Sequence, residues 1–157
     1  MLSSTLTKAL NQQVQREFYS AGLYLSMSSW AADQGYGNTA AWLEEQAKEE
    51  LEHGMKFFHY IQDRNSSAVV PSVEQPEGKF ESMEDVFTKV YEHEQQVTKW
   101  ICEIADAAMK EKDLVTWNWI QWAIEEQIEE EKQASEMLTK VKMSGKNLMM
   151  FDHHVSR

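Results

Sequence analysis

The segment SAVVPSVEQPEGKFE, residues 67–81, decides the fold because it holds both prolines of the chain, Pro71 and Pro76. Proline has no backbone N–H and interrupts a helix, so this segment is predicted to be an extended link between two helices. Fully extended, such a link spans roughly 50 Å. A helix of about 28 residues is only ~42 Å long. The link can therefore run the whole length of a helical bundle and leave the helices before and after it parallel.

Four long segments around this link have helical periodicity and few breakers. The connections within the first pair and within the last pair are only a few residues long, which makes each pair an antiparallel hairpin. Ser82 and Asp113 suit N-caps, and Gly145 suits the end of a helix. The tail, residues 144–157, has room for a short fifth helix. The predicted long helices cover about residues 4–33, 38–65, 82–110 and 113–143.

The composition excludes several classes of protein. With 15 basic against 26 acidic side chains, the chain is not expected to bind nucleic acid, which requires lysine and arginine contacts to phosphate. The single Cys102, expected to be a buried apolar filler, rules out a disulfide framework. No stretch approaches the roughly 20 apolar residues of a membrane span, and no signal peptide is recognisable. We expect an all-α, cytoplasmic protein with one domain over residues 1–157 and its bundle over about 4–143.

Each predicted helix carries an apolar stripe that a glutamate interrupts near the middle of the helix: Glu17, Glu50, Glu94 and Glu130, with His53 one turn after Glu50. Mid-helix positions share one level in a bundle, so these carboxylates are predicted to converge in its interior. Burying an unpaired carboxylate costs several kcal/mol. A divalent cation removes that cost, because hard cations prefer carboxylate oxygen and accept one imidazole. The alternative is that the stripes are rotated and the glutamates form the solvated surface of a helical interaction protein.

The motifs around these residues resemble those of the prokaryotic non-haem ferritins, within the ferritin-like di-iron superfamily. The motifs are REFYSAGLYLSMSSWA (16–31), EEQAKEELEHGMKF (44–57), YEHEQQVT (91–98) and WAIEEQIEEE (122–131). The resemblance covers essentially the whole chain and implies a ferritin-like four-helix bundle with a ferroxidase centre inside each subunit. The implied ligands are Glu17, Glu50 and His53 for a first iron; Glu50 as bridge, Glu94 and Glu130 for a second; and Glu49, Glu126 and Glu129 for a third, with Gln127 beside the pair.

Two aromatic residues lie two turns from predicted ligands, and the resemblance implies that the first of them, Tyr24, is close to the iron. Tyr24 lies two turns after Glu17 on the same helix face, as a hydrogen-bond donor or an electron source. Trp122 lies two turns before Glu130, as a packing residue or an electron donor. For both residues, ordinary packing in a bundle core is the alternative.

The sequence differs from the related bacterioferritins and rubrerythrins at positions that bear on function. Gln127 stands where bacterioferritins and rubrerythrins begin a second Glu-x-x-His, and Leu51 stands where bacterioferritins carry a haem-ligating methionine, so no haem is expected. The resemblance implies an iron-storage ferritin with ferroxidase activity that oxidises Fe(II) with O2 or H2O2. Its Fe(III) mineral would be deposited inside a homo-oligomeric, 24-subunit cage. The alternative enzyme is a di-iron peroxidase that consumes H2O2 without large-scale storage.

Overall fold

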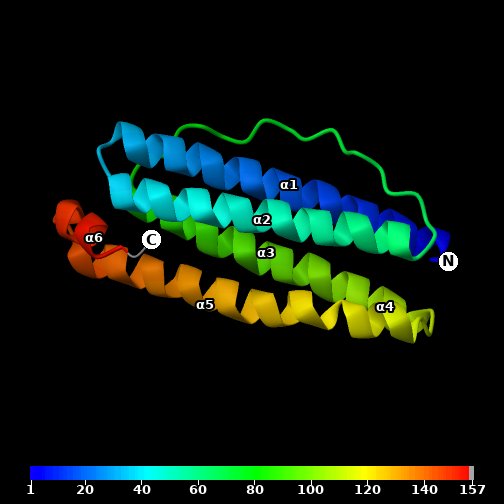
Figure 1. The fold of residues 1–157 in the computed structure, drawn as a ribbon. Coiled ribbons are helices and arrows are strands. Elements are labelled where there is room, and N and C mark those ends of the chain that lie inside the picture. The colour runs from blue at the N-terminus through cyan, green and yellow to red at the C-terminus, as the bar shows by residue number, and fades with distance from the viewer. Residues whose placement is uncertain (156–157) are drawn as a thin grey trace.

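The computed structural model describes residues 1–155, and this part of the chain contains helices and loops but no strand. Four long helices form a bundle, and two short helices complete it (Figure 1). The predicted all-α fold is therefore confirmed, while residues 156 and 157 of the predicted tail lie outside the described residues. The helices are α1 (Ser4–Asp33), α2 (Gly37–Asp63), α3 (Met83–Lys110), α4 (Leu114–Trp119), α5 (Gln121–Ser144) and α6 (Leu148–His154).

The segment between α2 and α3 crosses the full length of the bundle. In Figure 1 it leaves the end of α2 near the N-terminus of the chain and runs back along α1 to the opposite end, so α2 and α3 point the same way. Asn11 Nδ2 donates to the carbonyl oxygen of Ser67 at 2.9 Å, and Gln15 Nε2 donates to that of Ser72 at 2.6 Å. These hydrogen bonds from α1 hold the crossover on the outside of the bundle.

Capping residues begin and end the helices where the sequence predicts them. The side chain of Ser82 accepts a hydrogen bond from the backbone N–H of Asp85, and Asp113 accepts one from that of Thr116. Both predicted N-caps are thus confirmed. Gly145 ends α5 with a φ of +55°, a left-handed conformation that favours glycine. The short helix predicted in the tail is α6.

The last bundle helix differs from the single helix predicted over residues 113–143. The helix is interrupted at Ile120, between α4 and α5. The backbone N–H of Ala123 donates to the carbonyl oxygen of Ile120 at 3.0 Å, a bond of the tighter 3₁₀ type, and the N–H of Ile124 reaches the same oxygen at 3.3 Å. Ile120 itself keeps a helical φ of −68° and is fully buried, so α4 and α5 follow one path (Figure 1).

Two apolar clusters fill the bundle on either side of a polar layer. On α1, buried residues within 6–14 belong to one cluster and those within 23–31 to the other. On α3, the first cluster takes buried residues within 97–108 and the second takes those within 83–90. A group of buried polar residues lies between the clusters along each long helix, so this layer crosses the bundle near its middle. It includes Glu17, Glu50, Glu94, Gln127 and Glu130.

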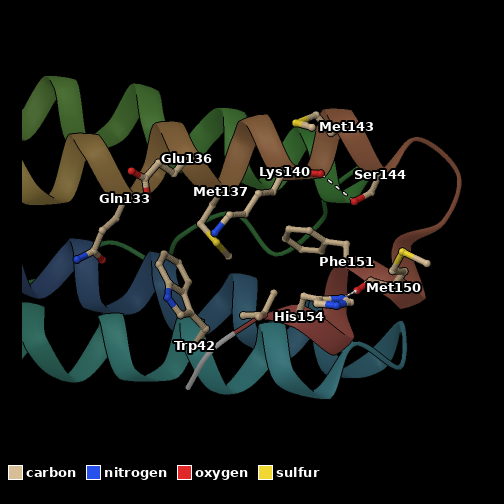
Figure 2. Close-up of a pocket in the computed structure, with 11 residues that line it drawn as sticks. Trp42, Gln133, Glu136, Met137, Lys140, Met143, Ser144, Met150, Phe151 and His154 are labelled. Carbon is tan, nitrogen blue, oxygen red and sulfur yellow. Dashed lines mark hydrogen bonds between the residues drawn. The ribbon is translucent and has the colours of Figure 1, made fainter.

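Helix α6 lies across one end of the bundle and borders a groove of about 510 Å³ between α2, α5 and α6 (Figure 2). Trp42 of α2 and Met137 and Lys140 of α5 line it. Asp152 fixes α6 to the start of α2, because its Oδ1 accepts hydrogen bonds from the backbone N–H and the hydroxyl of Thr39, both at 2.7 Å. None of the carboxylates of the polar layer lines this groove.

The position of Cys102 differs from the one predicted from the sequence. Cys102 is exposed, so the prediction of a buried filler is wrong. Its neighbour Ile101 is 2% exposed, and one position along a helix turns the side chain by ~100°. Within residues 1–155 no helix is both long enough and apolar enough to cross a membrane.

Candidate metal centre

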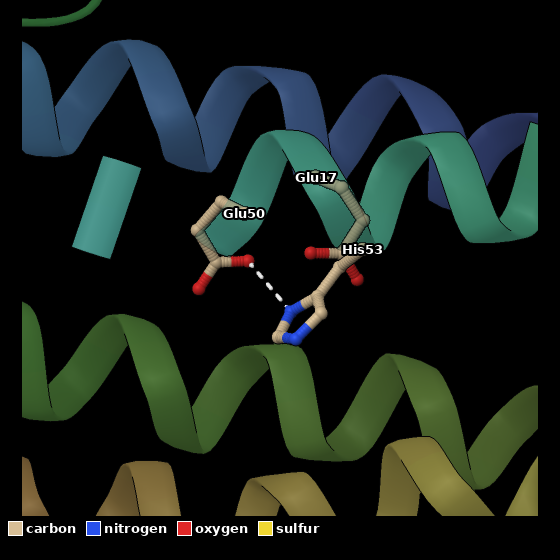
Figure 3. A group of neighbouring side chains, drawn as sticks. All are labelled: Glu17, Glu50 and His53. Atoms are coloured by element: carbon tan, nitrogen blue, oxygen red, sulfur yellow. Dashed lines mark ion pairs between the residues drawn. The ribbon is translucent and has the colours of Figure 1, made fainter. Parts of the chain in front are cut away.

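Glu17, Glu50 and His53 bring three metal-binding groups together in the middle of the bundle (Figure 3). One ligand atom of each lies within 4.8 Å of the other two. Glu17 comes from α1, whereas Glu50 and His53 are three residues apart on α2 and share one helix face. His53 Nδ1 is 3.5 Å from Glu50 Oε2. Both carboxylates are 2% exposed, so this group is held inside the protein.

Gly54 lets α1 and α2 approach closely enough to form this group. A Cβ atom at Gly54 would lie 2.5 and 2.7 Å from two ring carbons of Phe18 and 3.3 Å from Cβ of Glu17. A glycine inside a helix is destabilising by roughly 0.5–1 kcal/mol relative to alanine. Here the missing side chain gives the room in which Glu17 sits beside Glu50 and His53.

Two further carboxylates reach the polar layer from the opposite pair of helices. Glu94 of α3 is 0% exposed and Glu130 of α5 is 4% exposed. The Tyr24 hydroxyl donates to Glu94 Oε1 at 2.5 Å, and Gln127 Nε2 donates to Glu94 Oε2 at 3.0 Å. Glu94 and Glu130 are not part of the tight three-residue group, but their charges act on Glu50.

Gln13 holds Glu17 in place and was not among the predicted site residues. It is 0% exposed, one turn before Glu17 on α1, and its Nε2 donates to Glu17 Oε1 at 2.8 Å. The other oxygen of Glu17, Oε2, is buried and has no hydrogen-bond partner among the described residues. A buried acceptor without a partner is unfavourable by about 1–3 kcal/mol. In the sequence, Gln13 could have been recognised by its spacing of four residues from Glu17, which puts both side chains on one helix face. The prediction considered charged residues only, and an amide carries no charge.

Burial and mutual repulsion favour the protonated forms of these acids. Burial raises the pKa of Glu17 well above its usual range, and the charge of Glu50 raises it further. Burial likewise raises the pKa of Glu50, with repulsion from Glu94 and Glu130 adding to it. The pKa of Glu130 is raised to about 8, first by burial and then by the charge of Glu94. A cation that binds here must therefore displace protons.

Glu49, Glu126 and Glu129 surround this buried group on its solvent side. Glu126 Oε2 lies 3.7 Å from His53 Nε2, and its side chain is 43% exposed. Glu49 and Glu129 are exposed. All three carboxylates add to the raised pKa of Glu130 through charge repulsion. The structure thus puts all three near Glu130, and Glu49 and Glu126 also near His53, but outside the tight group of three ligands.

Buried carboxylates from all four long helices, with one imidazole beside them, define a class of four-helix-bundle metal proteins. Oxygen donors dominate the set, which fits a hard or intermediate divalent cation. The chain belongs to the ferritin-like domain family, whose sequence model matches residues 7–144. The resemblance to non-haem ferritins that the motifs carry is thereby confirmed.

Two relatives and one solved structure describe this likeness. The chain is 40% identical over 147 residues to a bacterial non-heme ferritin of Campylobacter jejuni, covering 94% of this chain and 88% of that protein. It is 36% identical over 147 residues to a bacterial non-heme ferritin of Escherichia coli, covering 94% of this chain and 89% of that one. The open pore ferritin of the archaeon Archaeoglobus fulgidus matches with a TM-score of 0.97 at 38% identity, over 99% of this chain and 98% of the other.

Proposed function

We propose that this protein is an iron-storage ferritin with ferroxidase activity. The observation that carries the proposal is the buried group of Glu17, Glu50 and His53, in which Glu17 Oε2 has no hydrogen-bond partner within the described part of the chain. Such an oxygen is ready to bind a cation. The family membership agrees with iron as that cation, since both relatives above are named as ferritins.

In this proposal the ligands divide between two irons. Glu17, Glu50 and His53 bind the first Fe(II), and Glu50 bridges to a second, which Glu94 and Glu130 also bind. Gln127 and Tyr24 orient Glu94 through the hydrogen bonds to its two oxygens. The exposed acids Glu49, Glu126 and Glu129 are proposed to hold a third iron on the solvent side.

Two Fe(II) ions supply the two electrons that reduce one O2 to H2O2. Each Fe(II) loses one electron, and one O2 accepts both electrons and two protons to become H2O2. Protons are at hand, because acids with a raised pKa, Glu130 among them, release protons when iron replaces them. The carboxylates bind Fe(III) more strongly than Fe(II), so they favour the oxidised product.

Storage requires a cavity, which one subunit does not enclose. We propose a cytoplasmic, homo-oligomeric cage of 24 subunits in which the Fe(III) product is deposited as mineral. A net charge of −11 for each chain favours this role, since clustered negative charge raises the local concentration of cations.

Stopped-flow oxidation of two Fe(II) per subunit by O2 tests the ferroxidase. His53→Ala and Glu130→Ala should each slow the first phase of Fe(II) oxidation by about a hundredfold or more. Mutation of residues that merely support metal ligands already costs about 10–100-fold. Glu125→Ala removes an exposed acid of the same helix and should leave the rate unchanged. A wild-type rate in Glu130→Ala would contradict the proposed ligand set.

A further inference from the structure

A row of aromatic rings leads from the metal centre to the end of α2. Between ring centroids, His53 lies 5.4 Å from Trp122, Trp122 lies 5.7 Å from Trp119, and Trp119 stacks on Tyr60 at 3.8 Å with the planes 10° apart. These are contact distances for aromatic pairs. Indole and phenol rings also lose single electrons more readily than most other side chains. The row is therefore a continuous path for electrons between Tyr60 and the centre.

Trp122 is placed to pass an electron on rather than to remain oxidised. The ammonium group of Lys56 lies 3.8 Å from the centre of its ring, and a cation there opposes a second positive charge on the indole. The indole N–H is buried and has no acceptor among residues 1–155. An oxidised Trp122 therefore has no group to take its proton, keeps its positive charge and is unfavourable.

Tyr60 has the outlet for a proton that Trp122 lacks. Arg64 Nη1 donates to the Tyr60 oxygen at 2.6 Å, which leaves the phenol hydrogen for Thr116 Oγ1 at 2.9 Å. The Thr116 hydroxyl in turn donates to Asp113 Oδ2 at 2.9 Å. A carboxylate only accepts, so with the Thr116 hydrogen on Asp113 the Tyr60 hydroxyl is the donor to Thr116 Oγ1. The Asp113 side chain is 15% exposed, so a proton can pass from it to water.

We propose that Tyr60 is an electron donor to the metal centre, through Trp119 and Trp122, when the centre holds one Fe(II) and meets H2O2. The inference rests on the proposed ferroxidase function. Reduction of H2O2 to two waters needs two electrons and two protons. Fe(II) gives one electron and Tyr60 gives the other. Tyr60 releases its phenol proton through Thr116 to Asp113 and on to water. Solvent supplies both protons that H2O2 takes up at the centre, and a neutral tyrosyl radical remains at Tyr60.

When the centre holds only one Fe(II), the path makes Tyr60 available as a second reductant. A single Fe(II) that reacts alone with H2O2 provides one electron only, and the O–O bond then breaks into hydroxide and a hydroxyl radical. With Tyr60 connected, both oxygens leave as water. The radical is placed at the end of α2, where Trp119 stacks on it and Arg64 binds its oxygen.

Freeze-quench electron paramagnetic resonance tests the path on the full-length assembled protein. Apo protein is loaded with one Fe(II) per subunit, mixed with H2O2 and frozen, with ring-deuterated tyrosine to identify tyrosyl signals and a spin trap to count hydroxyl radical. We compare Tyr60→Phe, which keeps the ring, and Trp119→Phe, which keeps an aromatic side chain. The matched control is Trp117→Phe, two residues away with a side chain that is 37% exposed and outside the row.

The wild type and Trp117→Phe should give a tyrosyl radical and little trapped hydroxyl radical. Tyr60→Phe and Trp119→Phe should lose that signal and trap more hydroxyl radical. All four proteins should oxidise two Fe(II) with O2 at one rate, and loss of that rate in the wild type would refute the ferroxidase rather than the path. A tyrosyl signal that survives in Tyr60→Phe and disappears in Tyr24→Phe would overturn the inference. So would a wild type that gives no tyrosyl signal while it oxidises iron normally.

Discussion

Glu130 makes the stability of the metal-free protein depend on pH. Its pKa is about 8 in the folded protein and near 4.5 when unfolded. Between these values the folded protein keeps a proton that the unfolded chain has lost, so stability falls as pH rises, by up to about 1.4 kcal/mol per pH unit. Glu130→Gln cannot ionise. We expect the unfolding midpoint of the chelated wild type to fall between pH 5 and pH 8, and to fall less in this variant.

Thermal melts of both proteins with chelator across that pH range measure this effect. Glu125→Gln removes an exposed charge from the same helix and should follow the wild type. An identical pH dependence in wild type and Glu130→Gln would show that Glu130 is ionised in the folded, metal-free protein.

The acids on the solvent side should be separable from the buried ones. Glu49 and Glu126 are not buried, and they lie outside the group of Glu17, Glu50 and His53. We expect Glu49→Ala and Glu126→Ala to retain rapid oxidation of the first two irons, because the buried ligands remain. Both should lower the number of Fe(II) bound per subunit in an anaerobic titration or slow later turnovers. Unchanged stoichiometry and turnover in both variants would show that these acids are only solvated charges.

At the scale of the helix pair, Gly54 sets the distance between α1 and α2. An alanine there meets ring carbons of Phe18 at 2.5 and 2.7 Å, closer than real contacts. Overpacking of this kind costs typically about 1–3 kcal/mol, which outweighs the ~1 kcal/mol that alanine gains in helix propensity. We expect Gly54→Ala to lower the melting temperature and to slow Fe(II) oxidation, because Glu17 is displaced from His53.

Gly22→Ala is the matched control, since it adds the same methyl group to α1. Its Cβ would find only Pro76 side-chain atoms, at 3.7 Å or more, which is ordinary contact. It should keep the oxidation rate and melt at the wild-type temperature or slightly above. If Gly54→Ala behaves in the same way, the close approach of the helices at Gly54 is not needed for the site.

The sequence predicts those parts of the molecule that follow from periodicity. The positions of the long helices and the burial of Glu17, Glu50, Glu94 and Glu130 follow from apolar stripes at spacings of three and four. The turn at Ile120 does not, because no glycine or proline marks it and a single 3₁₀ bond depends on packing. The stacking of Trp119 on Tyr60 joins different helices, and one sequence holds no sign of such a pair.

For the whole molecule, we predict assembly into a large homo-oligomer. The groove between α2, α5 and α6 and the exposed side chains of Met143 and Met150 leave apolar surface at one end of the bundle. Such surface is favourable to bury against other subunits. We expect purified protein to elute in size-exclusion chromatography with light scattering as a shell of about 24 chains of 18.3 kDa. A monomer or dimer would remove the storage role and favour the di-iron peroxidase.

The crossover also means that one covalent connection joins two helical hairpins that could exist as separate chains. Residues 69–79 lie exposed or partly exposed along α1, and Val70 is 81% exposed. The polar layer, by contrast, draws ligands from α1 and α2 on one side of this connection and from α3 and α5 on the other. Cleavage near Val70 would leave those contacts intact. Two co-expressed halves should therefore reassemble, and iron would act as the clamp that holds the split protein together.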